Sequence, residues 1–273
     1  MTLPTTETLL LEEQAGVLTI TLNRPDSRNA MSLAMVNELM AVFEACADEQ
    51  AIRAIVLRGA GGHFCAGGDI KDMAGARQKA AGGDKDAFFA LNRRFGEMIT
   101  LANRQPQVVI AVLEGAVLGG GFGLACVSDL AIARDDARFG LPETGLGVIP
   151  AQIAPFVVQR IGLTQARRLA LSGARFDGNE ALRLGIVHTV ADSDSDLDAQ
   201  LRGALDDIRR CAPNANRLTK ALVLSVGEVP MDTLLDQAAR DFADAVTGEE
   251  GQEGTMAFVQ KRLPAWADQG DAQ

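Results

Sequence analysis

The chain has 273 residues, of which 47% are hydrophobic and 23% charged, enough apolar material for one large domain with or without an appendage. A net charge of −10, a pI of about 4.8 and only 4% aromatic residues argue against a surface that binds nucleic acid. Four widely spaced cysteines predict reduced thiols. With neither a secretory signal nor a membrane span recognisable, we expect a cytoplasmic protein.

The first predicted elements are a strand, a helix and a second strand. "GVLTITLNRP" alternates apolar and polar residues before a turn, which predicts a strand over Val17–Leu22. Ser32 is suited to cap the amphipathic helix predicted to follow it, up to about residue 50. Residues 52–59, "IRAIVLRG", then indicate a short buried strand.

The same pattern recurs further along the chain. Residues 86–103 predict a helix, 107–115 a strand, the glycine cluster at 119–121 the start of another helix, and 129–133 a further strand. Repeated units of this kind predict an α/β protein with short parallel strands.

Beyond about residue 163 the signals are mainly helical. Residues 164–173 and 231–246 are apolar along one side, as in amphipathic helices. The acidic run at 191–200, "ADSDSDLDAQ", is interpreted as a solvated connection that marks a candidate boundary.

Two glycine-rich segments follow predicted strands. Gly67 and Gly68 come after the strand at 52–59, and Gly119–Gly121 come after the strand at 107–115. Ligands of α/β sheets gather at the carboxyl ends of strands, where glycines leave backbone N–H groups uncovered. A plain glycine turn explains the first segment as well as a site does, and the second segment does not continue as a nucleotide-binding motif.

Glu143 stands among apolar residues in "RFGLPETGLGVIPAQ". By itself it is equally well a structural acid or a general acid/base with a raised pKa. Together with two sets of free N–H groups, it predicts a site that holds an enolate oxygen while one carboxylate moves a proton at carbon. His63, Cys65 and His188 lack the spacing of a zinc site, so no metal site is predicted.

Taken together, the motifs resemble those of the crotonase, or enoyl-CoA hydratase/isomerase, superfamily. The resemblance covers nearly the whole chain and rests on "LNRPDSRNAMS", "FCAGGDIKDM", "AVLEGAVLGGGFGLACVSDLAIA", "FGLPETGLGVIP", "LTQARRLALSGARFDGNEALRLGIVHTV" and the tail at 254–266. It implies an α/β spiral of repeated β-β-α turns over 1–200 that carries a CoA-ester site. It also implies a helical oligomerisation region over 201–273, and homotrimers or hexamers formed as dimers of trimers.

The resemblance also implies roles for particular residues. Gly68 and Gly120 match the positions whose N–H groups bind the thioester oxygen, and Glu143 matches a catalytic glutamate. The positions that line the path of the adenine and pantetheine of CoA are matched by Ala66, Gly68, Asp69, Ile70 and Lys71. Arg28 and Lys261 match cations that meet CoA phosphates, the latter from a neighbouring subunit. No cofactor is implied, because CoA is part of the acyl-CoA substrate.

Gly123 departs from the family pattern, because it stands where well-studied hydratases carry a first catalytic glutamate. The wider phrases resemble bacterial glutaconyl-CoA hydratases, similar members of which also lack that glutamate. This implies a lyase that hydrates 3-isohexenylglutaconyl-CoA in acyclic terpene catabolism or 3-methylglutaconyl-CoA in leucine catabolism, and "PETGLGVIPAQIAPFV" favours the former. An enoyl-CoA isomerase, or a CoA-ester- or RNA-binding module without catalysis, are the alternatives, and residues 73–95 are expected to contribute to the acyl pocket.

Overall fold

The computed structural model describes residues 3–267 as a mixed α/β fold with two sheets. The larger sheet has the strand order β1-β2-β3-β4-β6-β9 and the smaller one the order β5-β7-β8. The strands are β1 (Leu9–Gln14), β2 (Val17–Leu22), β3 (Ala54–Gly59), β4 (Val108–Leu113), β5 (Ala116–Leu118), β6 (Leu130–Arg134), β7 (Arg138–Gly140), β8 (Arg175–Phe176) and β9 (Thr189–Ala191). The α/β class expected from the sequence is confirmed.

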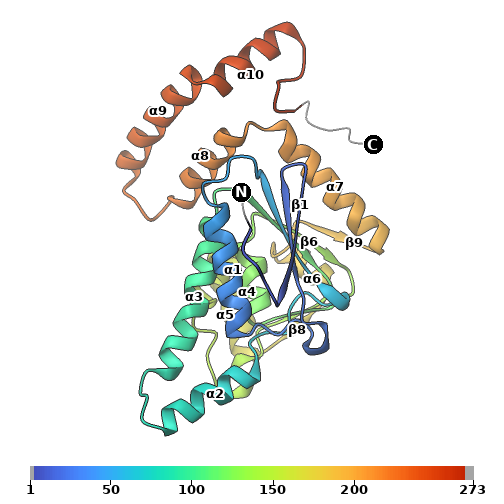
Figure 1. The fold of residues 1–273 in the computed structure, drawn as a ribbon, viewed down its shortest axis with the longest axis vertical. Coiled ribbons are helices and arrows are strands. Elements are labelled where there is room, and N and C mark those ends of the chain that lie inside the picture. Colours follow the sequence, from blue (N-terminus) through green and yellow to red (C-terminus); the bar gives the residue numbers. More distant parts are fainter. Residues whose placement is uncertain (1–2, 268–273) are drawn as a thin grey trace.

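The helices surround these sheets and continue beyond them (Figure 1). They are α1 (Leu33–Cys46), α2 (Ile70–Ala81), α3 (Ala87–Arg104), α4 (Gly120–Val127), α5 (Ala154–Ser172), α6 (Gly178–Arg183), α7 (Asp194–Arg210), α8 (Pro213–Leu224), α9 (Met231–Thr247) and α10 (Glu249–Gln260). Three short 3-10 helices, η1 (Pro25–Ser27), η2 (Ala60–Gly62) and η3 (Glu143–Leu146), lie in the connections. The predicted helices after Ser32 and over 86–103 correspond to α1 and α3.

The larger sheet is parallel except at one edge. β2, β3, β4, β6 and β9 pair in parallel, whereas β1 pairs antiparallel with β2 in the register Leu9↔Leu22. β1 is an edge strand that pairs only with β2, and its second half is acidic and exposed. Its alternation is therefore weak, and the sequence interpretation did not include it.

The two faces of the larger sheet have separate apolar cores. The main core contains side chains of α1, α3, α4 and α5, and its largest fully buried members include Phe43, Phe64 and Phe122. The second core lies between the other face and α7, and it includes Leu197 and Ile208 of α7 together with Val56 and Ile110. Burial on both faces explains why β3 and β4 appear in the sequence as continuous apolar runs.

The acidic run at 191–200 is helical over most of its length, so its interpretation as a solvated connection is wrong. Ser193 caps α7 by accepting a hydrogen bond from the N–H of Asp196. Asp194 and Asp196 stand in the first turn, where negative charge stabilises a helix. Leu197 is buried in the second core, so the run packs on the sheet. Because α7 continues through residue 200, the predicted division at 200/201 falls inside this helix, and the division stays a prediction.

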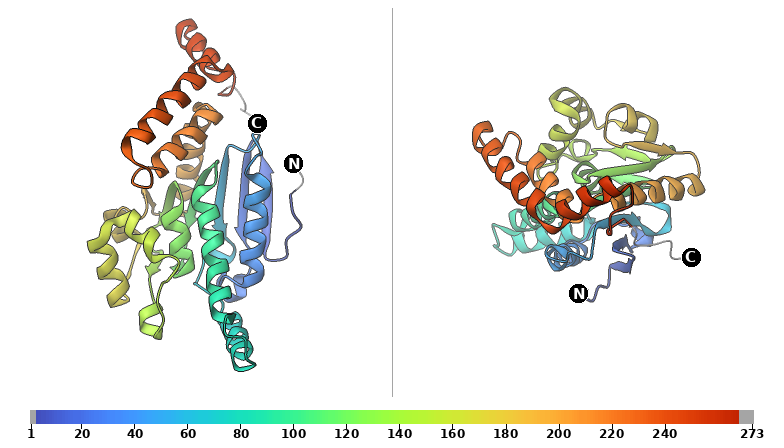
Figure 2. Two further views of the ribbon diagram at one scale, coloured as in Figure 1. Left: turned by 90° about the vertical axis from the view of Figure 1, so that its left-hand side faces the viewer. Right: turned by 90° about the horizontal axis from the view of Figure 1, so that it is seen from above.

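The last helices extend away from the sheets, as the orange and red ribbons in Figure 2 show. In α9 and α10 only Leu234 and Ala257 are buried, while several large apolar side chains are exposed: Met231, Leu235, Phe242, Val246, Met256, Phe258 and Val259. The guanidinium of Arg53 joins two C-terminal segments to β3. It donates to the carbonyl of Trp266, after α10, and to those of Ile208, Arg209 and Cys211, at the end of α7. Among residues 3–267, no helix has both the length and the apolar character needed to cross a membrane.

Candidate functional site

Three segments that run side by side bring the candidate residues together. The segment through Cys65 joins β5 through a parallel bridge to Val117, with the Cys65 N–H donating to Ala116 O at 2.8 Å and the Leu118 N–H donating to Cys65 O at 2.9 Å. β5 in turn pairs in parallel with β7. Gly68, Gly120 and Glu143 each follow the end of one of these segments. Since parallel segments end at the same edge, one edge presents all three residues.

The N–H of Gly120 is released because the backbone ladder stops. Continuation of the parallel pairing would direct this N–H to the carbonyl of Gly67, but that carbonyl accepts from the N–H of Met31 at 2.8 Å. Gly119 turns the chain with φ 50°, and α4 begins at Gly120. Within residues 3–267, the Gly120 N–H has no hydrogen-bond partner, and it stands at the positive end of α4.

The N–H of Gly68 is free for a related reason. Its neighbours make the bridge to Met31, since Gly67 O accepts from Met31 and the Asp69 N–H donates to Met31 O at 3.1 Å. In an extended segment the intervening N–H points to the opposite side. In the described part of the chain it too has no partner. The two free donors thus lie on adjacent segments that end at one edge.

Glu143 begins η3 directly after β7 and Pro142. Its Oε1 lies 2.9 Å from the position that a Cβ would take on Gly119, so the carboxylate rests against bare backbone next to Gly120. Its Oε2 is buried without a hydrogen-bond partner. Burial raises the pKa of the Glu143 carboxyl, and only its own backbone N–H acts in the opposite direction. This carboxyl is therefore suited to exchange a proton beside the two free N–H groups.

The space next to Gly123 is filled by apolar side chains. A Cβ at position 123 would overlap Cγ2 of Ile153 and lie 2.8 Å from Cδ1 of Ile99. Gly123 is itself buried in α4. The departure from the family motif is therefore matched by the packing around it, and Glu143 is the carboxylate that lies beside the glycine backbone.

Most of the residues predicted to bind CoA lie along one continuous stretch. The Ala66 N–H donates to Arg28 O at 3.0 Å, which ties the Arg28 turn to the glycine segment. Asp69 caps α2 by accepting from the Lys71 N–H and pairs with Arg24 at 2.6 Å. Ile70 and Lys71 form the first turn of α2, and Ile70 is 80% exposed. Arg24 was not singled out in the sequence, although it belongs to the motif "LNRPDS".

Lys261 does not join this stretch within one chain. It caps the C-terminal end of α10, directly after Gln260, in a left-handed conformation, φ 54°. In Figure 1, α10 lies at the opposite end of the molecule from α2, at whose start Asp69 and Lys71 lie. A role of Lys261 at the site therefore requires a second copy of the chain and stays a prediction.

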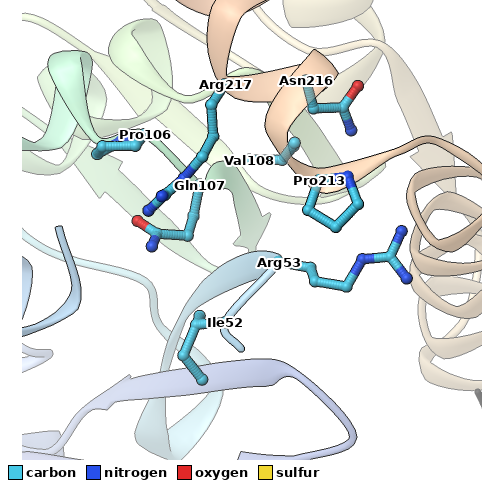
Figure 3. Close-up of a pocket in the computed structure, with 8 residues that line it drawn as sticks. All are labelled: Ile52, Arg53, Pro106, Gln107, Val108, Pro213, Asn216 and Arg217. Carbon is cyan, nitrogen blue, oxygen red and sulfur yellow. The ribbon is translucent and has the colours of Figure 1, made fainter. Parts of the chain in front are cut away.

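Two hollows lie away from the glycine edge. A cavity of about 10 Å³ lies at the N-terminal ends of β3 and β4. It is lined by Ile52, Arg53, Pro106, Gln107, Val108, Pro213, Asn216 and Arg217 (Figure 3). It is far smaller than the several hundred Å³ of a typical ligand site. A cleft of about 560 Å³ lies between α1, α2 and α3, lined on α2 and α3 by residues such as Gly75, Ala76 and Leu91. In residues 3–267, no group of three or more His, Cys, Asp or Glu side chains is arranged to hold a metal ion.

Comparison with known proteins identifies the family. The family model for enoyl-CoA hydratase/isomerase matches residues 12–269. Curated relatives include the mevalonyl-coenzyme A hydratase SIDH of Beauveria bassiana, 35% identical over 93% of this chain and 92% of that protein. The 2,3-dehydroadipyl-CoA hydratase of Escherichia coli is 32% identical over 94% of this chain and 97% of that protein. The chain therefore belongs to the enoyl-CoA hydratase/isomerase family, the crotonase superfamily that its motifs indicate.

Solved structures agree with this assignment. Pseudomonas aeruginosa AtuE is 65% identical, with a TM-score of 0.93 over 96% of this chain and all of that chain. An enoyl-CoA hydratase/isomerase from Marinobacter aquaeolei is 64% identical, with a TM-score of 0.93 over 96% of this chain and 99% of that one. The fold is thus that of the crotonases, and the chain is an enoyl-CoA hydratase-type enzyme, a carbon–oxygen lyase acting on CoA thioesters.

Proposed function

We propose that the enzyme hydrates the conjugated C2–C3 double bond of a branched glutaconyl-CoA thioester, with 3-isohexenylglutaconyl-CoA as its substrate. The observation that carries this proposal is the meeting of two unpartnered backbone N–H groups, at Gly68 and Gly120, with a buried, unpartnered oxygen of Glu143. The two donors suit a thioester oxygen that becomes negative, and the carboxylate suits a water and a proton.

In the proposed reaction, the oxygen of a water molecule bonds to C3 while Glu143 takes one of its protons. The π electrons of the double bond move to the C1–C2 bond, and those of the carbonyl move to the thioester oxygen. The N–H groups of Gly68 and Gly120 stabilise this enolate oxygen. Glu143 then gives its proton to C2, the carbonyl re-forms, and the product has gained one water. Because position 123 has no carboxylate, Glu143 performs both proton transfers in this scheme.

Exposed apolar side chains near the site support a long branched acyl group. Leu146 and Ile149, in the turn and loop that begin at Glu143, are exposed by 75% and 73%. Phe88 and Phe89, at the start of α3, are also exposed. A dissolved monomer rarely leaves this much apolar surface uncovered without a partner for it. The shorter 3-methylglutaconyl-CoA, which has only a methyl group at the branch, would leave more of this surface unused.

A double-bond isomerase is the second candidate, and one observation favours it. Ile153 and Ile99 fill the space beside Gly123, so a single carboxylate remains, which is sufficient for moving one proton between two carbons. Mass spectrometry of the product distinguishes the two reactions, since hydration adds the mass of one water and isomerisation adds none.

The substrate is tested by measuring kcat/KM of the purified enzyme on 3-isohexenylglutaconyl-CoA, 3-methylglutaconyl-CoA and crotonyl-CoA. We expect kcat/KM for hydration to be highest for 3-isohexenylglutaconyl-CoA, lower for 3-methylglutaconyl-CoA and lowest for crotonyl-CoA. A higher kcat/KM on 3-methylglutaconyl-CoA would assign the shorter substrate. Absence of water addition to either glutaconyl ester would overturn the proposal. Glu143→Gln is expected to abolish hydration while leaving the fold intact.

We also propose that copies of this chain assemble as trimers or as pairs of trimers. The exposed apolar side chains of α9 and α10 support an assembled state, because they would otherwise face water. Such an assembly would also let Lys261 of one copy approach the CoA site of another. We likewise propose that the enzyme is cytoplasmic, as the sequence predicts.

A further inference from the structure

A polar cluster of Asn92, Arg93 and Gln152 lies where α3 meets the loop before α5. The Gln152 amide donates from Nε2 to Asn92 Oδ1 at 2.9 Å, and its Oε1 accepts from Arg93 Nη1 at 3.4 Å. Gly96 makes this arrangement possible, because a Cβ there would overlap Gln152 Oε1 and lie 2.6 Å from Arg93 Nη1. Helix α3 and the loop before α5 are thus joined by the contacts of Gln152 with Asn92 and Arg93, which lie over the backbone of Gly96.

Arg93 differs from its neighbour Arg94 in its partners. Arg94 donates to Asn37 and pairs with Glu97 at 3.0 Å, so its charge is balanced. The guanidinium of Arg93 has no carboxylate partner among residues 3–267 and donates instead to the neutral amide of Gln152. A guanidinium held by one long, neutral contact keeps most of its donors available for an anion.

The position of the cluster relates it to the proposed reaction. On α3, Phe95 lies 3.0 Å from the Cβ position of Gly120, and Ile99 lies against Gly123. Gly96, between them, is the residue over which Gln152 and Arg93 meet, and Gln152 directly precedes Ile153. Helix α3 and the loop before α5 therefore contact Gly120 and Gly123, and the same two segments hold Arg93.

We infer that Arg93, positioned by Gln152 and Asn92, binds the free carboxylate of the acyl group and so selects CoA thioesters whose acyl chain ends in a carboxylate. This inference rests on the proposed hydratase function. A glutaconyl group branched at C3 has two carbon substituents there besides the chain that leads to the thioester, one apolar and one ending in a carboxylate. The apolar substituent suits the exposed side chains around Leu146, and the carboxylate suits a planar guanidinium that binds two oxygens at once. Arg93 acts here as a specificity-determining residue, since it meets the carboxylate and not the reacting carbons.

The test uses two substrates that differ only in this carboxylate. 3-Methylglutaconyl-CoA and 3-methylbut-2-enoyl-CoA share the thioester, the double bond and the methyl branch. We expect Arg93→Gln to lower kcat/KM for the first ester, mainly through KM, by about 10- to 100-fold, as loss of a charge-assisted hydrogen bond does. Turnover of the neutral ester should change little, and Arg93→Lys should recover part of the loss. Arg104→Gln, at the C-terminal end of the same helix, is the matched control and should leave the ratio of the two kcat/KM values unchanged.

The outcomes separate this inference from the proposed function. If the unaltered enzyme adds water to neither ester nor to 3-isohexenylglutaconyl-CoA, the proposed function fails. If it hydrates the carboxylate-bearing esters and Arg93→Gln keeps the ratio between the paired esters, the inference about Arg93 is overturned while the proposed function stands. An equal loss on both esters, with KM unchanged, would give Arg93 a structural role and would likewise overturn the inference. Thermal unfolding of each variant identifies losses due to instability.

Discussion

Ile153 occupies the space that a side chain on Gly123 would need. Its Cγ2 overlaps the Cβ position of that glycine, and its Cβ lies 3.0 Å away. Ile153 directly precedes α5 and is nearly fully buried, so its side chain packs within the main core. The absence of a carboxylate at position 123 is therefore built into the packing between α4, α3 and the loop after Glu143.

This packing predicts strong coupling between positions 123 and 153. Gly123→Ala should destabilise the protein by about 1–3 kcal/mol, as overpacking of a core does. Ile153→Ala should cost about 2–5 kcal/mol through loss of buried methyl groups. The double variant should lose at least about 1 kcal/mol less than the sum, because the new methyl group enters the space that Ile153 leaves. Urea unfolding of the four proteins measures the coupling, and strictly additive losses would show that the two residues do not compete for space.

Replacement of Glu143 by Gln should abolish turnover and stabilise the fold at neutral pH. Burial raises the pKa of this carboxyl, so the folded state holds its proton more tightly than the unfolded state. The associated stability is complete below the pKa of the unfolded group and is lost as pH rises through the higher folded value. Glutamine is neutral at every pH, so the variant should be more stable than the unaltered enzyme at pH 7, with the gain disappearing in acid. Thermal unfolding from pH 4 to pH 8 tests this, and a gain that is equal at all pH values would contradict it.

Removal of the Gly68 N–H should lower kcat without preventing substrate binding. A Cβ at position 68 meets nothing within 4 Å, so Gly68→Ala should fold and retain its N–H and most of its activity. Gly68→Pro lacks the donor and should lose about 100- to 1000-fold in kcat, as removal of one oxyanion donor does. Steady-state kinetics of the two variants, with circular dichroism to check folding, makes the comparison. Equal activities in folded Ala and Pro variants would exclude this N–H from the reaction.

The apolar surface of the C-terminal helices should control assembly. Phe258 is 85% exposed on α10, and a charge there should oppose burial against another copy. Phe258→Asp is expected to shift the protein toward smaller species in sedimentation velocity. Leu10→Asp, at an exposed site on β1, serves as the control and should leave the mass unchanged. If Phe258→Asp sediments as the unaltered protein does, this part of α10 is not at an interface.

Local patterns in the sequence determined the class of fold and the identity of the main candidate residues. The alternation in β2 and the continuous apolar runs in β3 and β4 match the burial of these strands, and such patterns can be recognised within each segment alone. The glycine clusters and the lone Glu143 indicated an enolate site because free N–H groups and an apolar carboxylate are properties of short stretches. The acidic run was misread because the burial of Leu197 against the sheet depends on the fold around it, although the cap by Ser193 is a local signal.

Tertiary structure decided what those residues meet. Release of the Gly120 N–H depends on Met31 taking the carbonyl of Gly67, and these residues are far apart in the chain. Ile153 beside Gly123, and Gln152 with Arg93 over Gly96, join segments more than 25 positions apart, and no local pattern marks such encounters. A sequence segment specifies which groups it offers, whereas pairing across the fold specifies which of them remain without a partner, and the reaction proposed for this enzyme uses the groups that remain without one.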